Sequence, residues 1–513
     1  MPENFRALIA VLVLSLPTWR WLRPRLTAVA IDPSDYRVRA GLWVAVTLAL
    51  FLSHNFWLFV LVLALGVLWA SAKDSHPLGL YCFLLFAAPA FHRTIPGVGS
   101  IAFILSVDYL RVLSAFLLLP LALRLARSHH TPGIFRLPSD KFVVAYLVLN
   151  VVLQAPVTSV TDSLRAIVGY LLDVVLPYFV FSRGLDSIEK FRDALGSFVA
   201  AAVVLSVIGV FETGKGWLLY SMLGDVLNAT WGFGSYMMRE GALRASASVG
   251  HSIVFGYVLV AALGMLFALR SSFPTRRSWL IALCVIGAGI VASGSRGPWV
   301  GAAVVLAVVA LMSPDVTARL GKLAVLSVVL VPVIMLTPIG GRIISVLPFI
   351  GSADDGSVTY RQQLFTVSWR VIMMNPLLGS PHYMLNPELE QMRQGEGIID
   401  IVNSYIGIAL YSGFLGLALF AGAFLPTLAR LFGHLRLIRS SDSEAFALGL
   451  GLAAALTGVL VMIATLSSVD VVPVVYWSLA GACAAYVHRD SLANASTEFA
   501  FARPPMAPHA NGR

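Results

Sequence analysis

Long apolar segments, separated by short basic or polar loops, run through almost the whole chain and constrain its fold more than any other feature. A helix needs about 20 apolar residues to cross a bilayer. Candidate spans lie near residues 5–19, 39–53, 55–72, 77–94, 101–124, 141–155, 163–182, 193–212, 249–270, 278–294, 297–313, 320–338, 402–430, 445–466 and 470–488. The first is short and ends at Pro17, so a helix lying in the membrane interface is an alternative there. We predict an all-α, polytopic membrane protein with about 12–15 transmembrane helices.

Composition supports this class, since 58% of the residues are apolar and 12% are charged. No small-residue cleavage site follows the apolar run 7–16, so we expect no cleaved signal peptide. The cysteines, Cys82, Cys284 and Cys483, fall inside apolar spans, which predicts packing rather than disulfides or metal ligation. In a membrane protein the net charge of +10 indicates topology and lipid contact rather than nucleic-acid binding.

Lys and Arg accumulate in the cytoplasmic loops of membrane proteins. The basic clusters are Arg20/Arg23/Arg25/Arg37/Arg39, Arg124/Arg127/Arg136/Lys141, Arg270/Arg276/Arg277, Arg319/Lys322, Arg430/Arg436/Arg439 and Arg489/Arg503. From the second cluster onward, an even number of spans separates each cluster from the next, so all of these can face the cytoplasm together. The segments left on the other side are 95–100, 156–162, 213–248, 294–297, 339–401 and 467–470.

This topology divides the chain into parts. We expect N-terminal membrane helices over 1–140, central membrane helices over 141–338 with an extracytoplasmic loop at 213–248, a long extracytoplasmic loop with short helices over 339–401, C-terminal membrane helices over 402–490, and a disordered cytoplasmic tail over 491–513.

Arginines on the outer side break the charge rule. They are Arg239, Arg244, Arg296, Arg342, Arg361, Arg370 and Arg393. Arg296 is the most informative, because Gly294, Gly297 and Pro298 place it between two apolar spans, where a cation is costly unless it meets an anion or water. Such side chains can reach out to lipid headgroups. A guanidinium also binds phosphate through paired hydrogen bonds, and we therefore predict an outer pocket for an anionic or phosphorylated substrate.

Three segments carry the other candidate residues. In 243–259, Arg244 precedes His251, which is either a core or interfacial histidine or a hydrogen-bond donor to a sugar or phosphate. In 395–417, Glu396, Asp400 and Asn403 lead into a membrane helix, where a carboxylate either caps the helix or acts as a general base. Gly413 and Gly416 suit close packing or a kink in that helix.

The segment 358–379 predicts a helix that ends at Asn375-Pro376, with a turn at Gly379. Its apolar stripe consists of Leu364, Val367, Val371 and Met374, flanked by Phe365 and Ile372. Arg361 and Arg370 are nine residues apart and lie on opposite faces of such a helix. Arg361, next to Tyr360, is the better site candidate.

No phosphate-cradling loop, metal motif or nucleophile elbow is present in the sequence, so we expect no metal and no cofactor. A lipid-linked oligosaccharide flippase or exporter would place ionisable groups in several helices near mid-membrane. The deeply placed ones are few, namely Asp108, Arg111, Arg165 and Asp173. The clustering of arginines on the outer side favours an enzyme over this transporter and over a non-catalytic scaffold for polysaccharide export.

Four stretches together resemble the O-antigen ligase and Wzy-type polysaccharide polymerase family of bacterial envelope proteins. They are RASASVGHSIVFG (244–256), SGSRGPWVG (293–301), YRQQLFTVSWRVIMMNPLLGSP (360–381) and VNSYIGIALYSGFLGL (402–417). The resemblance implies an integral-membrane, GT-C-like glycosyltransferase in the bacterial cytoplasmic membrane. Its site would face the periplasm and take an undecaprenyl-diphosphate-linked glycan as donor, without a metal or cofactor. Membrane lipids, a chain-length regulator and export proteins would be its further partners.

By the same resemblance, Arg244 and Arg296 would hold the diphosphate, with Arg361 nearby. Ligases of the family carry a histidine directly before the Asn of the last motif, and here that residue is Val402. Asp400 is the nearest replacement base. The substitution favours a polymerase of exopolysaccharide repeat units over an O-antigen ligase that transfers glycan to a lipid acceptor.

Overall fold

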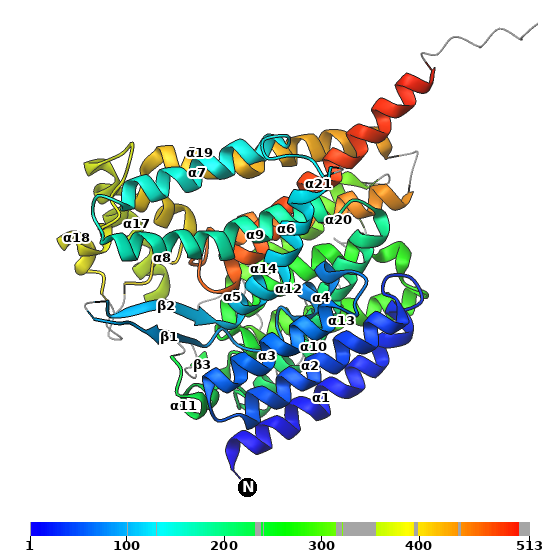
Figure 1. The fold of residues 1–513 in the computed structure, drawn as a ribbon, viewed down its shortest axis with the longest axis horizontal. Coiled ribbons are helices and arrows are strands. Elements are labelled where there is room, and N and C mark those ends of the chain that lie inside the picture. The colour runs from blue at the N-terminus through cyan, green and yellow to red at the C-terminus, as the bar shows by residue number, and fades with distance from the viewer. Residues whose placement is uncertain are drawn as a thin grey trace, which may run out of the picture.

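The computed structural model describes residues 2–99, 101–129, 131–230, 238–239, 241–313, 316, 321, 355–393, 399–439 and 443–501. Helices dominate this part of the chain (Figure 1). They are α1 (Glu3–Leu26), α2 (Pro33–Leu52), α3 (Phe56–Ser71), α4 (Pro77–Leu84), α5 (Tyr109–Leu113), α6 (Leu119–Arg127), α7 (Pro138–Gln154), α8 (Val160–Tyr170), α9 (Leu176–Gly184), α10 (Ile188–Lys215), α11 (Leu223–Leu227), α12 (Ser252–Ala268), α13 (Arg276–Ala292), α14 (Arg296–Met312), α17 (Asp355–Met374), α18 (Pro387–Glu390), α19 (Ser404–Ile438), α20 (Ser443–Met462) and α21 (Val471–Phe501). Short π-helical turns, Ser114–Leu118 and Leu171–Val175, join α5 to α6 and α8 to α9.

The predicted all-α, polytopic class is confirmed. Within the described residues, 7 helical segments are long and apolar enough to cross a membrane: Glu3–Leu26, Tyr109–Arg127, Val160–Gly184, Ile188–Lys215, Ser404–Ile438, Glu444–Met462 and Val471–Arg489. Three shorter apolar helices, α3, α12 and α14, accompany them. Helix α1 continues through Pro17 to Leu26 and packs against α2 and α10, so it is longer than the short first span that the sequence predicted. The predicted span 320–338 lies outside the described residues.

Two expectations about secondary structure were wrong. The predicted spans 77–94 and 101–124 are interrupted by an antiparallel pair, β1 (His92–Pro96) and β2 (Phe103–Asp108), because Pro89, Pro96 and Gly97 end the helical pattern. A second short pair joins β3 (Met238–Arg239) and β4 (Ala242–Leu243). Of the tail expected to be disordered over 491–513, residues 491–501 continue α21 as a helix, because they include helix-forming Ala, Leu and Glu. Residues 502–513 lie outside the described residues, so disorder there stays a prediction.

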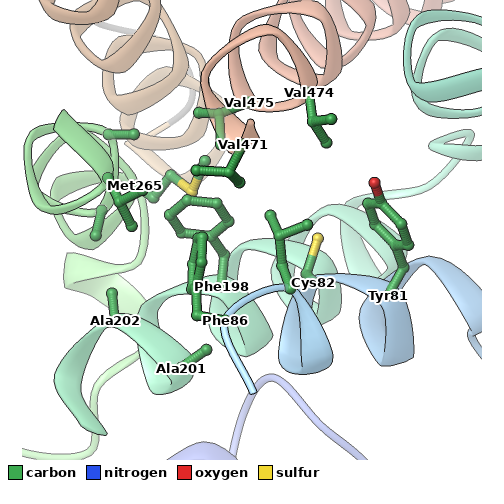
Figure 2. Packing of buried hydrophobic residues seen from close by; sticks show 14 of the residues in the cluster. Tyr81, Cys82, Phe86, Phe198, Ala201, Ala202, Met265, Val471, Val474 and Val475 are labelled. Carbon is green, nitrogen blue, oxygen red and sulfur yellow. The ribbon is translucent and has the colours of Figure 1, made fainter. Parts of the chain in front are cut away.

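The core lies where α4, α10, α12 and α21 meet (Figure 2). The rings of Phe86 and Phe198 pack edge to face with their centroids 5.1 Å apart. Cys82 and Cys483 are buried free thiols in this core, as predicted, whereas Cys284 is exposed on α13. The close packing of the central helices fixes the positions of the loops at both of their ends.

The loops gather at two opposite ends of the bundle. Figure 1 shows β1, β2, α11, α17 and α18 at one end, which we call the site end, and the C-terminal part of α21 at the other, which we call the basic end. At the basic end the buried Arg39 pairs with Asp74 and Asp193, each at 2.6 Å, which joins α2, the loop before α4, and α10. A second buried pair, Arg183–Asp140 at 2.6 Å, joins α9 to α7.

Helix α19 is broken at Ser412 and Gly413, where the sequence allowed a kink. The turn at residues 375–380 packs against the break and is hydrogen-bonded to both sides of it. Ser380 N donates to Leu410 O (2.8 Å), and Phe414 N donates to Pro376 O (2.8 Å). Gly379 and Gly413 both have φ of +63°, and a Cβ on either would lie within 2.6 Å of the other segment's backbone. The two glycines therefore permit the close approach that satisfies the backbone groups freed by the break.

Candidate functional site

Two arginines hold the turn that precedes Arg296. The turn, residues 293–295, connects α13 to α14. Arg244 Nη2 donates to Ser295 Oγ at 2.6 Å, and Arg239 Nη1 donates to Gly294 O at 3.1 Å. Gly294 has φ of +55°, and a Cβ there would lie 2.9 Å from Arg244 Cγ. The structure thus brings Arg244 to the segment of Arg296, although about fifty residues separate them in sequence.

Arg296 is the first residue of α14 and is half-buried. A helix N-terminus carries a partial positive charge, to which the guanidinium of Arg296 adds. Arg239 and Arg244 bring two further guanidinium groups to the turn before it. Such an arrangement suits a phosphate or diphosphate.

His251 lies directly before α12 and caps it, because its Nδ1 accepts a hydrogen bond from Ile253 N at 3.3 Å. Burial, and secondarily the positive charge of Arg244, lowers the pKa of His251 to about 4. The imidazole is therefore neutral at neutral pH. Its position gives it a structural role as a helix cap and places it close to Arg244.

Glu212 is a site residue that sequence reasoning missed. It is fully buried near the end of α10, and its carboxylate accepts hydrogen bonds from three backbone N–H groups. These are Leu219 N at 3.0 Å, Ser246 N at 3.1 Å and Ala247 N at 2.8 Å. The carboxylate fixes the backbone directly after Arg244. The signal was available, since Glu212 is an acidic residue late in a long apolar helix.

The segment of Asp400 lies along the loop 463–470, which joins α20 to α21. Ser467 Oγ donates to Asp400 Oδ1 at 2.8 Å. Ser404, at the start of α19, donates through both N and Oγ to Leu466 O, at 3.1 and 2.8 Å. Asn403 caps α19 by accepting hydrogen bonds from Tyr405 N and Ile406 N. The carboxylate of Asp400 itself is therefore held by a side chain and does not cap the helix.

Helix α17 approaches the site from the Asp400 side. Tyr360 OH donates to Asp400 O at 3.2 Å, which places the neighbouring Arg361, an exposed residue, on this side. Arg370 pairs with Glu388 at 3.4 Å on the opposite face of α17, as the nine-residue spacing predicted. Arg393 pairs with Glu390 at 2.6 Å. Glu396 and Arg342 lie outside the described residues.

The predicted apolar stripe of α17 is partly confirmed. Leu364, Val367, Val371 and Ile372 are buried against residues 389–410. Phe365 and Met374 were wrongly assigned to the stripe, because both are exposed. The rings of Phe365 and Trp369 stack on the outside of α17, and the Trp369 ring centroid lies 6.1 Å from that of Phe414 in α19.

The loop 463–470 connects the parts of the site. Gly297, next to Arg296, faces Thr465 so closely that a Cβ on the glycine would lie 2.5 Å from Thr465 Oγ1. Ser467 binds Asp400, and Asp470 ends the loop. This loop was predicted only as a short outer segment, since Ser, Thr and Asp are ordinary loop residues and gave no distinguishing signal.

Asp470 lies beside an ion-pair cluster formed by three of the deeply placed residues. Arg111 pairs with Asp173 at 3.0 Å and with Asp108 at 3.3 Å. Burial raises the pKa of Asp108 to about 6, and burial together with the charge of Asp108 raises the pKa of Asp470 to about 6. The fourth, Arg165, pairs with Asp162 and donates to Ile104 O. Arg111, Asp108 and Asp173 thus form one ion-paired cluster between the start of α5 and the π-helical turn before α9.

Residues 280–421 match the family model described as O-Antigen ligase. This part of the chain is similar to O-antigen ligases. The match confirms the family resemblance over Arg296, Arg361 and Asp400, while Arg244 and the loop 463–470 lie outside it. The chain is a multi-pass membrane protein, and the matched family implies glycosyltransferase-like activity on lipid-linked glycans. No curated protein matches this chain. Among the described residues, no group of three His, Cys, Asp or Glu side chains could hold a metal ion.

Proposed function

We propose that this protein is a polymerase. It joins undecaprenyl-diphosphate-linked oligosaccharide repeat units into exopolysaccharide on the outer face of the cytoplasmic membrane. The observation that carries the proposal is the meeting of Arg239 and Arg244 on the turn before Arg296, at the end of the bundle opposite most of the basic loops. The positive-inside rule supports placing the site end on the periplasmic side.

In the proposed reaction, a sugar hydroxyl of one repeat unit attacks the anomeric carbon of another. A new glycosidic bond forms, and the bond between that carbon and the diphosphate oxygen breaks. Undecaprenyl diphosphate leaves with the electron pair, and the guanidinium groups of Arg244 and Arg296 stabilise the charge that develops on it.

The hydroxyl proton passes to a base, for which we propose Asp400. The side-chain hydrogen bond from Ser467 supports this choice because it orients the carboxylate. Asp400 also lies two residues before Val402, the position at which related ligases carry histidine. His251, Tyr360, Asn403 and Arg361 complete the proposed substrate-binding surface, together with Glu396 of the neighbouring loop.

An O-antigen ligase is the second candidate, and the description of the matched family favours it. The two activities differ in the acceptor, since a polymerase uses another lipid-linked repeat unit and a ligase uses a different lipid. Val402 weighs against the ligase, because the histidine of the ligase motif is absent.

The test uses the full-length protein in liposomes supplied with undecaprenyl-diphosphate-linked repeat units alone. A polymerase produces a ladder of longer lipid-linked glycans without any second acceptor. A product that forms only after a lipid A core acceptor is added would overturn the polymerase proposal in favour of the ligase.

A further inference from the structure

A cavity of about 460 Å³ opens at the basic end between α7, α19 and α21. Its polar lining consists of Arg136, Thr427, Arg430, His434 and His488. Leu437 and Val487 are among the apolar residues that line it. The cavity is far from the residues of the proposed reaction, since α19 and α21 begin at the site end and line the cavity only with residues 427–437 and 484–488.

The charge of this cavity is unbalanced. Among the residues whose side chains the structure describes, no carboxylate lines it. Two other arginines at this end, Arg39 and Arg183, have acidic partners. Within the described part of the chain, Arg136 and Arg430 form no ion pair with a carboxylate, and both are exposed. The nearby Asp140 is buried and is already paired with Arg183.

Helix α7 begins beside the cavity at Pro138, which lines it together with Leu137. The N-terminus of this helix is already capped, because the carboxylate of Asp140 accepts a hydrogen bond from Leu137 N at 3.1 Å. The donors available to a phosphate are therefore the two guanidinium groups, each of which can offer paired N–H groups.

The rest of the lining points to a lipid rather than to a free ion. Much of it is apolar, and Leu437, with 77% of its surface exposed, lies at the rim. The helices that form the walls are two candidate membrane spans, α19 and α21, and the apolar helix α7. A headgroup phosphate can thus occupy the basic part while the glycerol and acyl chains continue along apolar helix surfaces. Basic pockets between membrane helices recognise anionic headgroups in this way.

We propose that this cavity binds the phosphate-containing headgroup of an anionic phospholipid from the leaflet at the basic end. The site is separate from the glycan site and does not depend on the proposed polymerase activity. Bound lipid would clamp α7, α19 and α21 together at the end where these helices diverge from the core.

The test measures thermal unfolding of the full-length protein in detergent during titration with phosphatidylglycerol, phosphatidylcholine or inorganic phosphate. The test variant is Arg136→Gln/Arg430→Gln. The control is Arg276→Gln/Arg277→Gln, which removes the same charge at the same end but outside the cavity lining. Melting temperatures without lipid establish that both variants are folded.

We expect phosphatidylglycerol to raise the melting temperature of the wild type and of the control, whereas phosphatidylcholine and inorganic phosphate do not. In the cavity variant, phosphatidylglycerol should bind at least about tenfold more weakly, because two charge-assisted contacts are lost. An equal response of the cavity variant and the wild type would overturn the proposal. The proposal would also be overturned if the control lost its response to phosphatidylglycerol as fully as the cavity variant, because the effect would then be one of non-specific charge. Stabilisation by inorganic phosphate as strong as by phosphatidylglycerol would overturn it too.

Discussion

Ser467 Oγ donates a 2.8 Å hydrogen bond to Asp400 Oδ1 and so ties the segment before α19 to the loop before α21. The same hydroxyl also bonds to Ile401 O at 2.8 Å. In this loop Thr465 contacts the segment of Arg296, and Asp470, five residues later, lies beside the Arg111 cluster. Substitutions near Arg296 and substitutions in the Arg111 cluster can therefore be tested separately.

Arg244→Lys and Arg296→Lys test the diphosphate role. Lysine keeps the charge but lacks the planar pair of donors, so a role in anchoring to headgroups would survive this change and diphosphate recognition would not. Loss of one charge-assisted hydrogen bond costs roughly 1.5–3 kcal/mol, or about 10- to 100-fold in rate. We expect polymer to fall by this factor and lipid-linked repeat units to accumulate, as measured by gel and lipid analysis.

The matched control is Arg370→Lys, because Arg370 faces away from Arg361 and pairs with Glu388. Its polymer yield should stay close to that of the wild type. If both the Arg244 and Arg296 variants polymerised normally at normal protein levels, diphosphate recognition would be excluded. The two arginines would then only anchor the helices to lipid headgroups.

Asp400→Asn tests the proposed base. The amide keeps the size and can still accept the hydrogen bond from Ser467, but it cannot take up a proton. We expect kcat to fall by about 100-fold or more, with little change in KM. Ser467→Ala, which leaves the carboxylate but removes its orienting partner, should lower kcat less, by about tenfold. An unchanged kcat for Asp400→Asn would exclude Asp400 as the base.

Asp470→Asn tests the carboxylate cluster through the pH dependence of stability. The folded protein holds the pKa of Asp470 at about 6, above the ordinary value of 3.8. It therefore binds the proton more tightly than the unfolded chain does, and stability should increase as the pH falls from above 6 towards 4. We expect the variant to melt higher than the wild type at pH 7.5 and to show a weaker pH dependence.

The control is Asp186→Asn, at an exposed carboxylate that pairs only with Lys190 at the surface. Its melting profile should follow the wild type. A lower melting temperature of Asp470→Asn at pH 7.5 would instead mean that ionised Asp470 is stabilised by Arg111.

Membrane orientation can be tested with single cysteines in a background that lacks the three native ones. Gln391 is exposed at the site end and Ser128 is exposed at the basic end. In intact spheroplasts, an impermeant maleimide should label Gln391→Cys and leave Ser128→Cys unlabelled until the membrane is opened. The reverse labelling pattern would invert the proposed orientation of the site.

Helix α17 should lie in the membrane interface with one apolar face against lipid. Phe365 and Trp369 are 56% and 46% exposed, and the ring of Trp369 packs against Phe414 of the membrane helix α19. A spin label at Phe365→Cys should be more accessible to oxygen than to a water-soluble nickel complex. The matched label at Gln363→Cys, on the opposite face, should show the reverse. Equal accessibility at the two positions would place α17 in water.

The helical membrane class could be predicted from the apolar runs alone, because their length leaves few alternatives in a bilayer. The parity of the basic clusters also placed Arg244 and Arg296 on the same side. It did not predict that Arg244 would bond to Ser295, since that contact depends on where the 243–250 segment is held. Glu212 holds the 243–250 segment in place by accepting hydrogen bonds from backbone N–H groups, two of them in that segment and one at Leu219. These hydrogen bonds are visible only in the three-dimensional structure.

Local interruptions were the other source of error. The apolar residues Phe103, Ile104 and Val107 suit a strand as well as a membrane helix, so hydropathy could not identify β2. On α17, Phe365 and Leu364 are equally apolar, and only the position of residues 389–410 decides which of them is buried.

The break in α19 divides that helix into a short N-terminal part, residues 404–411, and a longer part beyond Gly413 that packs against α7 and α21. The 375–380 turn after α17 is hydrogen-bonded to both parts, through Leu410 O on one side and Phe414 N on the other. The N-terminal part is also hydrogen-bonded to Leu466. The break thus joins α17, both parts of α19 and the loop before α21 at one place. We therefore expect Asn403 and Asp400 to keep a fixed position relative to α17 when substrate binds.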